Sequence, residues 1–209
     1  MKIKPEELTK LFYSQMHKLR HLDTPQAIRL PLLQKKKDVI SKAIKIWIEK
    51  YPNETLDTLA EKGIYLIIPV IPRSYIGIYA LIMMVRHGGE IGETYIDPER
   101  LTNVIETPKR PYYAIDVENG KAMLGKSPCD AEEIINRQNR SCLIVDEIIS
   151  LGIFTKVLST HTVYAIGSRY NLKDVPRLCM DNQTPSLDCY GTGLYTTENW
   201  GYGSCGSRF

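Results

Sequence analysis

Hydrophobic residues recur at helical spacing along the first sixty residues of the chain. In residues 5–21 the apolar side chains follow at intervals of three and four, after a proline and two glutamates that suit a first helical turn. Residues 33–51 repeat this pattern, with an apolar stripe opposite five lysines. Residues 24–31 hold two prolines and are expected to link the two helices, and a short third helix is expected over residues 54–62. These stripes must pack on the rest of the chain or on a second copy.

The pattern changes at residue 64. Residues 64–70 are rich in β-branched side chains and contain a proline near their end, which predicts a buried strand. Residues 74–85 are equally apolar; their glycine and β-branched residues favour a strand, but their length favours a helix, which we expect. Another short helix is expected near residues 97–104, with Asp97 as its N-cap.

The second half of the chain mixes turns, helices and short strands. Residues 111–125 are expected to form a β-hairpin around an Asn-Gly turn. Helices are expected over residues 127–138 and between residues 143 and 158. After His161, short apolar runs alternate with Asn, Asp, Gly and Pro, as strands and their turns do. We therefore expect an α+β protein, with helices first and a largely antiparallel sheet at the end.

The composition is that of a compact globular protein. Hydrophobic residues make up 43% and charged residues 24% of the 209 positions, which excludes a disordered chain, while 14 glycines and 12 prolines are too few for a collagen-like one. The longest apolar tract, residues 64–85, is interrupted by Pro69, Pro72 and Arg73, so no membrane span is expected. The N-terminus lacks the apolar core of a secretory signal, and we expect a cytoplasmic location.

Positive charge is concentrated at the N-terminus. Residues 1–50 carry 12 Lys and Arg against 5 Asp and Glu, whereas the remaining residues carry 15 against 19, for a net charge of +3. We expect a basic helical region over residues 1–63, packed on an α+β domain over residues 64–209. The basic face can bind nucleic acid or an acidic protein, form the interface of a homodimer, or simply be solvated.

Five cysteines stand far apart in the sequence, without the close Cys or His pairs of a structural zinc site. We expect reduced, mostly buried thiols and no metal. The sequence also lacks the phosphate-binding loop, the nucleophile elbow and the zinc-protease motif. The sequence therefore leaves the cofactor and the reaction, if there is one, unknown.

Several short motifs follow one another in a distinctive order after residue 100. They are Glu106-Thr107-Pro108, Pro111-Tyr112-Tyr113, Asp116-Val117-Glu118-Asn119-Gly120, Gly125-Lys126-Ser127-Pro128, Arg140-Ser141, Gly167-Ser168-Arg169, Val175-Pro176 and Ser204-Cys205-Gly206-Ser207-Arg208. In this order the motifs resemble an uncharacterised prokaryotic family known only as a domain of unknown function, over residues 64–209. The resemblance implies no activity, substrate or catalytic residue, so the candidate sites rest on side-chain chemistry.

Two Gly-Ser-Arg segments are the first candidate for a binding site. Each places a hydroxyl and a guanidinium near the end of an expected strand, a set suited to a carboxylate or a phosphate. We interpret Ser168, Arg169, Ser207 and Arg208 as candidate ligands of a small anion. The alternative is that both arginines form structural ion pairs with carboxylates of the same domain.

Weaker candidates for catalysis are Asp116, Glu118 and Cys205. The two carboxylates are two positions apart on an expected strand and share one face, where they can divide acid and base roles or bind a divalent cation. Solvent exposure or turn capping is the alternative. Cys205 lies in a glycine-rich segment and is expected to be the most accessible thiol, with His87 or His161 as its base if the fold brings them together.

Two classes of function remain open from the sequence. The one we favour is a small-molecule or anion-binding domain, with or without enzymatic activity, whose pocket lies in the C-terminal β region. The other is an interaction module that binds nucleic acid or an acidic protein through the N-terminal helices, or a structural homodimer.

Overall fold

The computed structural model describes residues 4–190 and 197–209. Its first four helices are α1 (Pro5–His21), α2 (Gln26–Gln34), α3 (Lys36–Lys50) and α4 (Leu56–Glu61). The expectation of a non-helical linker over residues 24–31 is wrong. Helix α2 begins at Gln26, and Pro31 lies inside it. Ile28 and Leu32 of α2 are fully buried, and this packing outweighs the hydrogen bond that the proline removes.

The strands form two main sheets. The first has the order β1 (Ile64–Val70), β6 (Tyr112–Glu118), β13 (Ser204–Arg208) and β7 (Ser141–Cys142), and all its pairings are antiparallel. The second has the order β12 (Trp200–Tyr202), β8 (Thr162–Tyr164), β10 (Val175–Asp181), β11 (Thr184–Tyr190) and β4 (Glu93–Thr94), with parallel pairs at β12–β8 and β11–β4. Two small ribbons pair β2 (Arg86–His87) with β3 (Glu90–Ile91) and β5 (Leu101–Asn103) with β9 (Ser168–Tyr170). The expected α+β class is confirmed.

Three further helices belong to the second half of the chain or lead into it. They are α5 (Arg73–Ile82), α6 (Pro128–Arg137) and α7 (Val145–Phe154), and all three confirm the expected helices. The side chain of Ser127 caps α6 by accepting a hydrogen bond from the Asp130 N–H at 3.1 Å. Gly77 interrupts α5 with φ 76° and ψ 157°. This break explains why the segment has the length of a helix but also a glycine that favours a strand.

Two local expectations differ from the structure. The prediction of a β-hairpin over residues 111–125 is confirmed for its first strand, which is β6. The expected return strand is wrong, because this segment forms a 3₁₀ helix, η2 (Lys121–Met123). Both edges of β6 are already paired with β1 and β13, which come from distant parts of the sequence. The helix near residues 97–104 is only a 3₁₀ turn, η1 (Pro98–Arg100), with Asp97 as its cap.

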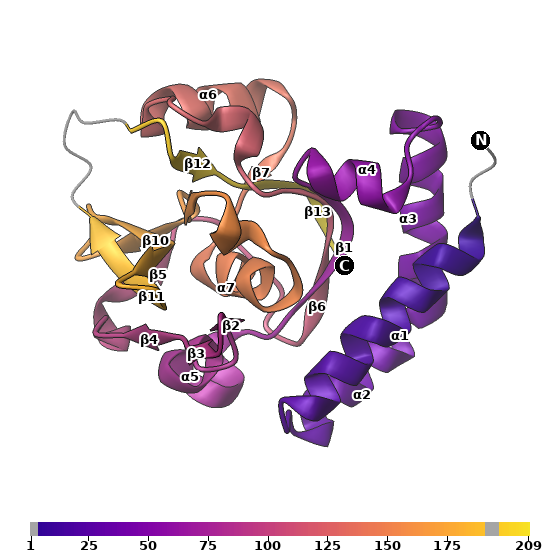
Figure 1. Cartoon of the computed structure of the whole chain (residues 1–209), viewed down its shortest axis with the longest axis horizontal. Helices are drawn as coiled ribbons and strands as arrows, with labels where there is room; N and C mark the ends of the chain where they lie inside the picture. Colours follow the sequence, from indigo (N-terminus) through magenta and orange to yellow (C-terminus); the bar gives the residue numbers. More distant parts are fainter. Residues whose placement is uncertain (1–3, 191–196) are drawn as a thin grey trace.

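The core lies on both faces of the first sheet. Helices α1–α3 lie on one side of β1 and β6, and α7 lies on the other (Figure 1). Phe12, Leu19 and Trp47 of the N-terminal helices share one hydrophobic cluster with Ile67 of β1 and Ile149 of α7. The apolar stripes of the N-terminal helices therefore pack on the rest of the same chain. No helix in the described part of the chain has the length and apolarity that a membrane span requires.

Candidate functional site

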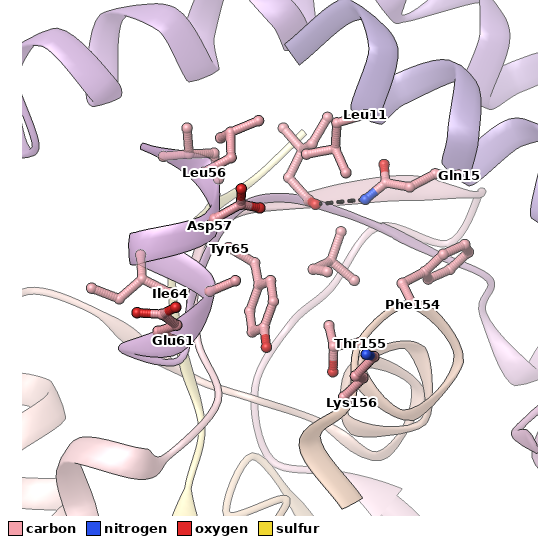
Figure 2. A pocket seen from close by; sticks show the side chains of 14 residues that line it. Leu11, Gln15, Leu56, Asp57, Glu61, Ile64, Tyr65, Phe154, Thr155 and Lys156 are labelled. Carbon is pink, nitrogen blue, oxygen red and sulfur yellow. Dashed lines mark hydrogen bonds between the residues drawn. The ribbon is translucent and has the colours of Figure 1, made fainter. Parts of the chain in front are cut away.

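A cleft of about 680 Å³ lies between α1, α4, β1 and the end of α7 (Figure 2). Its walls are mainly aliphatic and aromatic, with polar side chains at a few positions. The lining residues are Leu11, Gln15, Leu56, Asp57, Ala60, Glu61, Ile64, Tyr65, Leu66, Ile67, Ile68, Phe154, Thr155 and Lys156. The size and the apolar walls with few polar groups are typical of small-molecule sites.

Strand β1 contributes five consecutive residues to the cleft, from Ile64 to Ile68. It is the outer strand of the first sheet, paired only with β6 there, so its second edge is open to other groups. An uncovered edge strand is normally protected by a helix or a side chain. Here Gln15 of α1 supplies part of that cover, since its Nε2 donates a hydrogen bond to the Ile67 carbonyl oxygen at 2.9 Å.

Gln15 is the polar group deepest in this region. The side chain is 5% exposed, and its Oε1 has no hydrogen-bond partner within residues 4–190 and 197–209. The amide orientation is fixed by its neighbour, because only the nitrogen can donate to the Ile67 carbonyl; the oxygen is thus left as an acceptor. Leaving such an acceptor unpaired costs about 1–3 kcal/mol.

The rim of the cleft carries charges of both signs. Asp57 and Glu61 of α4 are one helical turn apart and both line the cleft, while Lys156 follows α7 on the opposite side (Figure 2). The hydroxyl end of Tyr65 lies beside Thr155 (Figure 2). Burial raises the pKa of Tyr65, and its hydrogen-bond interactions with Thr155 and Asn119 act in the opposite direction.

Arg208, a candidate anion ligand, is engaged by a buried carboxylate. Its Nε and Nη2 donate to the two oxygens of Glu147 at 2.7 and 2.8 Å, and its remaining donors reach Ser141 Oγ and the Cys142 carbonyl. Glu147 lies in the first turn of α7 beside Asp146, which pairs with Arg73 at 3.2 Å. Burial raises the pKa of Asp146 to about 6, against the opposing charge of Arg73.

The other Gly-Ser-Arg segment lies on β9, in a different sheet from β13. Arg169 Nη1 donates to the carbonyls of Ile166 and Ser168 at 2.6 and 2.8 Å, and no carboxylate of the described residues forms an ion pair with it. The Ser168 hydroxyl accepts from the Val145 N–H and donates to Asn103. Ser207 stands opposite Ile115 in the β13–β6 ladder. A role of these residues in anion binding stays a prediction.

Asp116 and Glu118 converge on Arg140, as their shared strand face predicts. Arg140 Nη1 lies 2.8 Å from Asp116 Oδ2 and 3.4 Å from Glu118 Oε1. Asp116 also accepts from Lys50 Nζ at 2.6 Å and from the Tyr51 hydroxyl at 2.8 Å. Burial alone would raise the pKa of Asp116, but these donors together hold it below its ordinary value. We refer to Lys50, Tyr51, Asp116, Glu118 and Arg140 as the Asp116 cluster.

The expectation that Cys205 is the most accessible thiol is wrong. Its side chain is 0% exposed because β13 is an inner strand of the first sheet, and burial raises its pKa to about 12. His161 is hydrogen-bonded to the Asn119 carbonyl and the Thr160 hydroxyl, each at 2.9 Å. Of the five cysteines, which are all free, Cys129 is the exposed one. Within residues 4–190 and 197–209, no three His, Cys, Asp or Glu side chains are placed to hold a metal ion.

Sequence reasoning missed the cleft, whose lining comes from four separate segments. One signal was present: Gln15 is the polar member of an otherwise apolar buried stripe on α1. The partners of Asp116 gave no such signal, because Lys50 and Arg140 lie 66 and 24 positions away from it.

Comparison with known proteins identifies the family but no characterised relative. No curated protein and no solved structure matches this chain significantly. A family model matches residues 33–204, a range that contains all the cleft residues except Leu11 and Gln15. The chain therefore belongs to a family of unknown function, DUF5701.

Proposed function

We propose that this protein binds a small, mostly apolar molecule in the cleft along β1. The observation that carries the proposal is the cleft of about 680 Å³ itself, with apolar walls along β1 and charged side chains at its rim. Burial of an apolar ligand contributes about 25 cal/mol for each Å² removed from water. The polar side chains at the rim then fix the orientation of the ligand, as polar groups in such sites do.

This proposal keeps the small-molecule class favoured by the sequence and moves its site. An anion at Arg208 would have to displace Glu147 from a bidentate contact in which the carboxylate is 1% exposed. The cleft requires no such displacement, since its space is already open.

A cleft-filling substitution tests the proposal. Ala60 lines the cleft from α4 and is exposed, so Ala60→Trp fills the space without disturbing the core. The matched control is Ala27→Trp, an exposed helical alanine of α2 outside the cleft. We expect the apolar dye Nile red to bind the full chain and the control with equal affinity, and the Ala60→Trp protein at least about ten-fold more weakly. Equal binding by all three proteins, or binding by none, overturns the proposal.

A second candidate is nucleic-acid binding through the basic helices. Lys35 and Lys42 place their ammonium groups 5.5 and 5.3 Å from the centre of the Phe209 ring, and Arg110 lines the same surface depression as Lys35. Phosphate contacts by such groups would make binding fall steeply with salt. The test is Lys35→Glu with Lys42→Glu, read by anisotropy of a labelled oligonucleotide. Deletion of the helices is unsuitable, because Phe12 and Trp47 belong to the core.

A further inference from the structure

We propose that His17 and His21, on the exposed face of α1, form a two-ligand site for a divalent transition-metal ion such as Ni²⁺ or Cu²⁺. The two histidines are four residues apart in the helix, so their side chains lie on the same face, one turn apart. Both are exposed, and their Nε2 atoms lie 3.0 Å from each other. Neither residue lines the cleft of the proposed function. The cysteine spacing predicts no metal, and this site uses no cysteine.

The distance between the two nitrogens suits chelation of one metal ion. Bonds from a metal to imidazole are about 2.0–2.1 Å long, so an ion bound to both nitrogens subtends an angle of about 95°. Neighbouring ligands in square-planar and octahedral coordination meet at about 90°, whereas tetrahedral ligands are about 109° apart. Ni²⁺ and Cu²⁺ adopt the first two geometries. Coordination uses the lone pair of each Nε2, with the ring proton on Nδ1.

The two rings are held by a fixed helix and have no competing partner. Phe12, Met16 and Leu19 of α1 are buried in the core, which fixes the backbone beneath the pair. Within residues 4–190 and 197–209, neither ring has a hydrogen-bond, ion-pair or ring partner except the other ring. A helix that already presents both ligands loses little conformational freedom when the metal binds. The pair is therefore preorganised.

The surroundings of the pair select the class of metal. Lys18 and Arg20 lie in the same turn of α1, so charge alone attracts no cation to it. Imidazole lone pairs bind transition metals, whereas Mg²⁺ and Ca²⁺ require oxygen ligands. No third His, Cys, Asp or Glu of the described residues joins the pair, so water completes the coordination. His21 also lines a depression of about 270 Å³ between the C-terminal ends of α1 and α5, which leaves space for this water.

Isothermal titration of the full chain with Ni²⁺ and with Mg²⁺ tests the site. Every protein carries Cys129→Ser, so that the exposed thiol takes no part. We expect His21→Gln to bind Ni²⁺ at least about ten-fold more weakly than the parent protein, because one of two linked ligands is lost. The control, His87→Gln, removes a partly exposed histidine of β2 and is expected to keep the parent affinity. Equal Ni²⁺ affinity of His21→Gln and parent, no Ni²⁺ binding by the parent, or equally tight binding of Mg²⁺ overturns the proposal.

A further variant separates the spacing of the histidines from their number. Lys18→His with His21→Gln keeps two histidines at exposed positions and removes a positive charge, but it places the rings on adjacent residues, which do not face each other. We expect this protein to bind Ni²⁺ as weakly as His21→Gln does. Binding as tight as that of the parent protein overturns the assignment of the site to histidines one turn apart.

Discussion

Two polar regions lie where the N-terminal helices meet the first sheet, and they differ in whether their groups are paired. In the Asp116 cluster, one buried carboxylate receives donors from Lys50, Tyr51 and Arg140 at 2.6–2.8 Å. At the wall of the cleft, Gln15 Oε1 receives none from the described residues. The first arrangement holds α3 to β6 and leaves nothing for a ligand. The second leaves one acceptor without a donor among those residues.

The same contrast applies to the arginines. A guanidinium in a strand suits an anion as well as a structural carboxylate, and the sequence alone does not decide between them. In the structure Arg208 has its donors filled by Glu147, Ser141 and Cys142. Pairing, more than residue type, therefore separates the groups that support the fold from those available for function.

Arg208→Ala is expected to have the largest effect. It leaves the Glu147 carboxylate buried without its counter-charge, which should lower the free energy of unfolding by about 3–5 kcal/mol. Urea denaturation measures this change. The control is Arg137→Ala, which removes an exposed ion pair with Glu133 and should cost less than about 1 kcal/mol. An unchanged unfolding curve for Arg208→Ala, with loss of phosphate binding, would instead identify Arg208 as a ligand residue.

Asp116→Asn is expected to cost about 2–3 kcal/mol, because Arg140, with its side chain 6% exposed, then keeps only Glu118 as a counter-charge. Since the folded pKa of Asp116 lies below its ordinary value of 3.8, the advantage of wild type should be fully present at pH 7. It should shrink as the pH falls below about 4. Denaturation of both proteins at several pH values checks this. A constant difference across that range would contradict the role of the charge.

Asp146 should show the opposite pH dependence. Its folded pKa of about 6 exceeds the ordinary 3.8, so the folded protein binds this proton more tightly than the unfolded chain does. Wild type should therefore gain stability relative to Asp146→Asn as the pH falls from 7 toward 4, by at most about 1.4 kcal/mol per pH unit. The melting temperatures of both proteins at pH 7, 6 and 5 test this prediction. Parallel curves would show that Asp146 stays charged beside Arg73.

Local patterns predicted much of the fold and little of the site. The helical spacing of α1, the cap at Ser127 and the β-branched run of β1 are properties of a few neighbouring residues, and all three elements form. The return strand expected after Gly120 does not form, because both edges of β6 pair with β1 and β13. The cleft likewise arises from four segments that only the tertiary fold brings together.

Gln15→Met is expected to change stability least, which is the sharpest contrast with Asp116. The substitution keeps the side-chain length, removes the unpaired Oε1 and loses one hydrogen bond to Ile67. The buried Ile67 carbonyl loses this donor, which costs about 1–3 kcal/mol, and removal of the unpaired Oε1 returns a similar amount, so the free energy of unfolding should stay within about 1–2 kcal/mol of wild type. Urea denaturation measures this change. A strongly destabilised Gln15→Met protein would place Gln15 with the Asp116 cluster, as a residue that serves the fold.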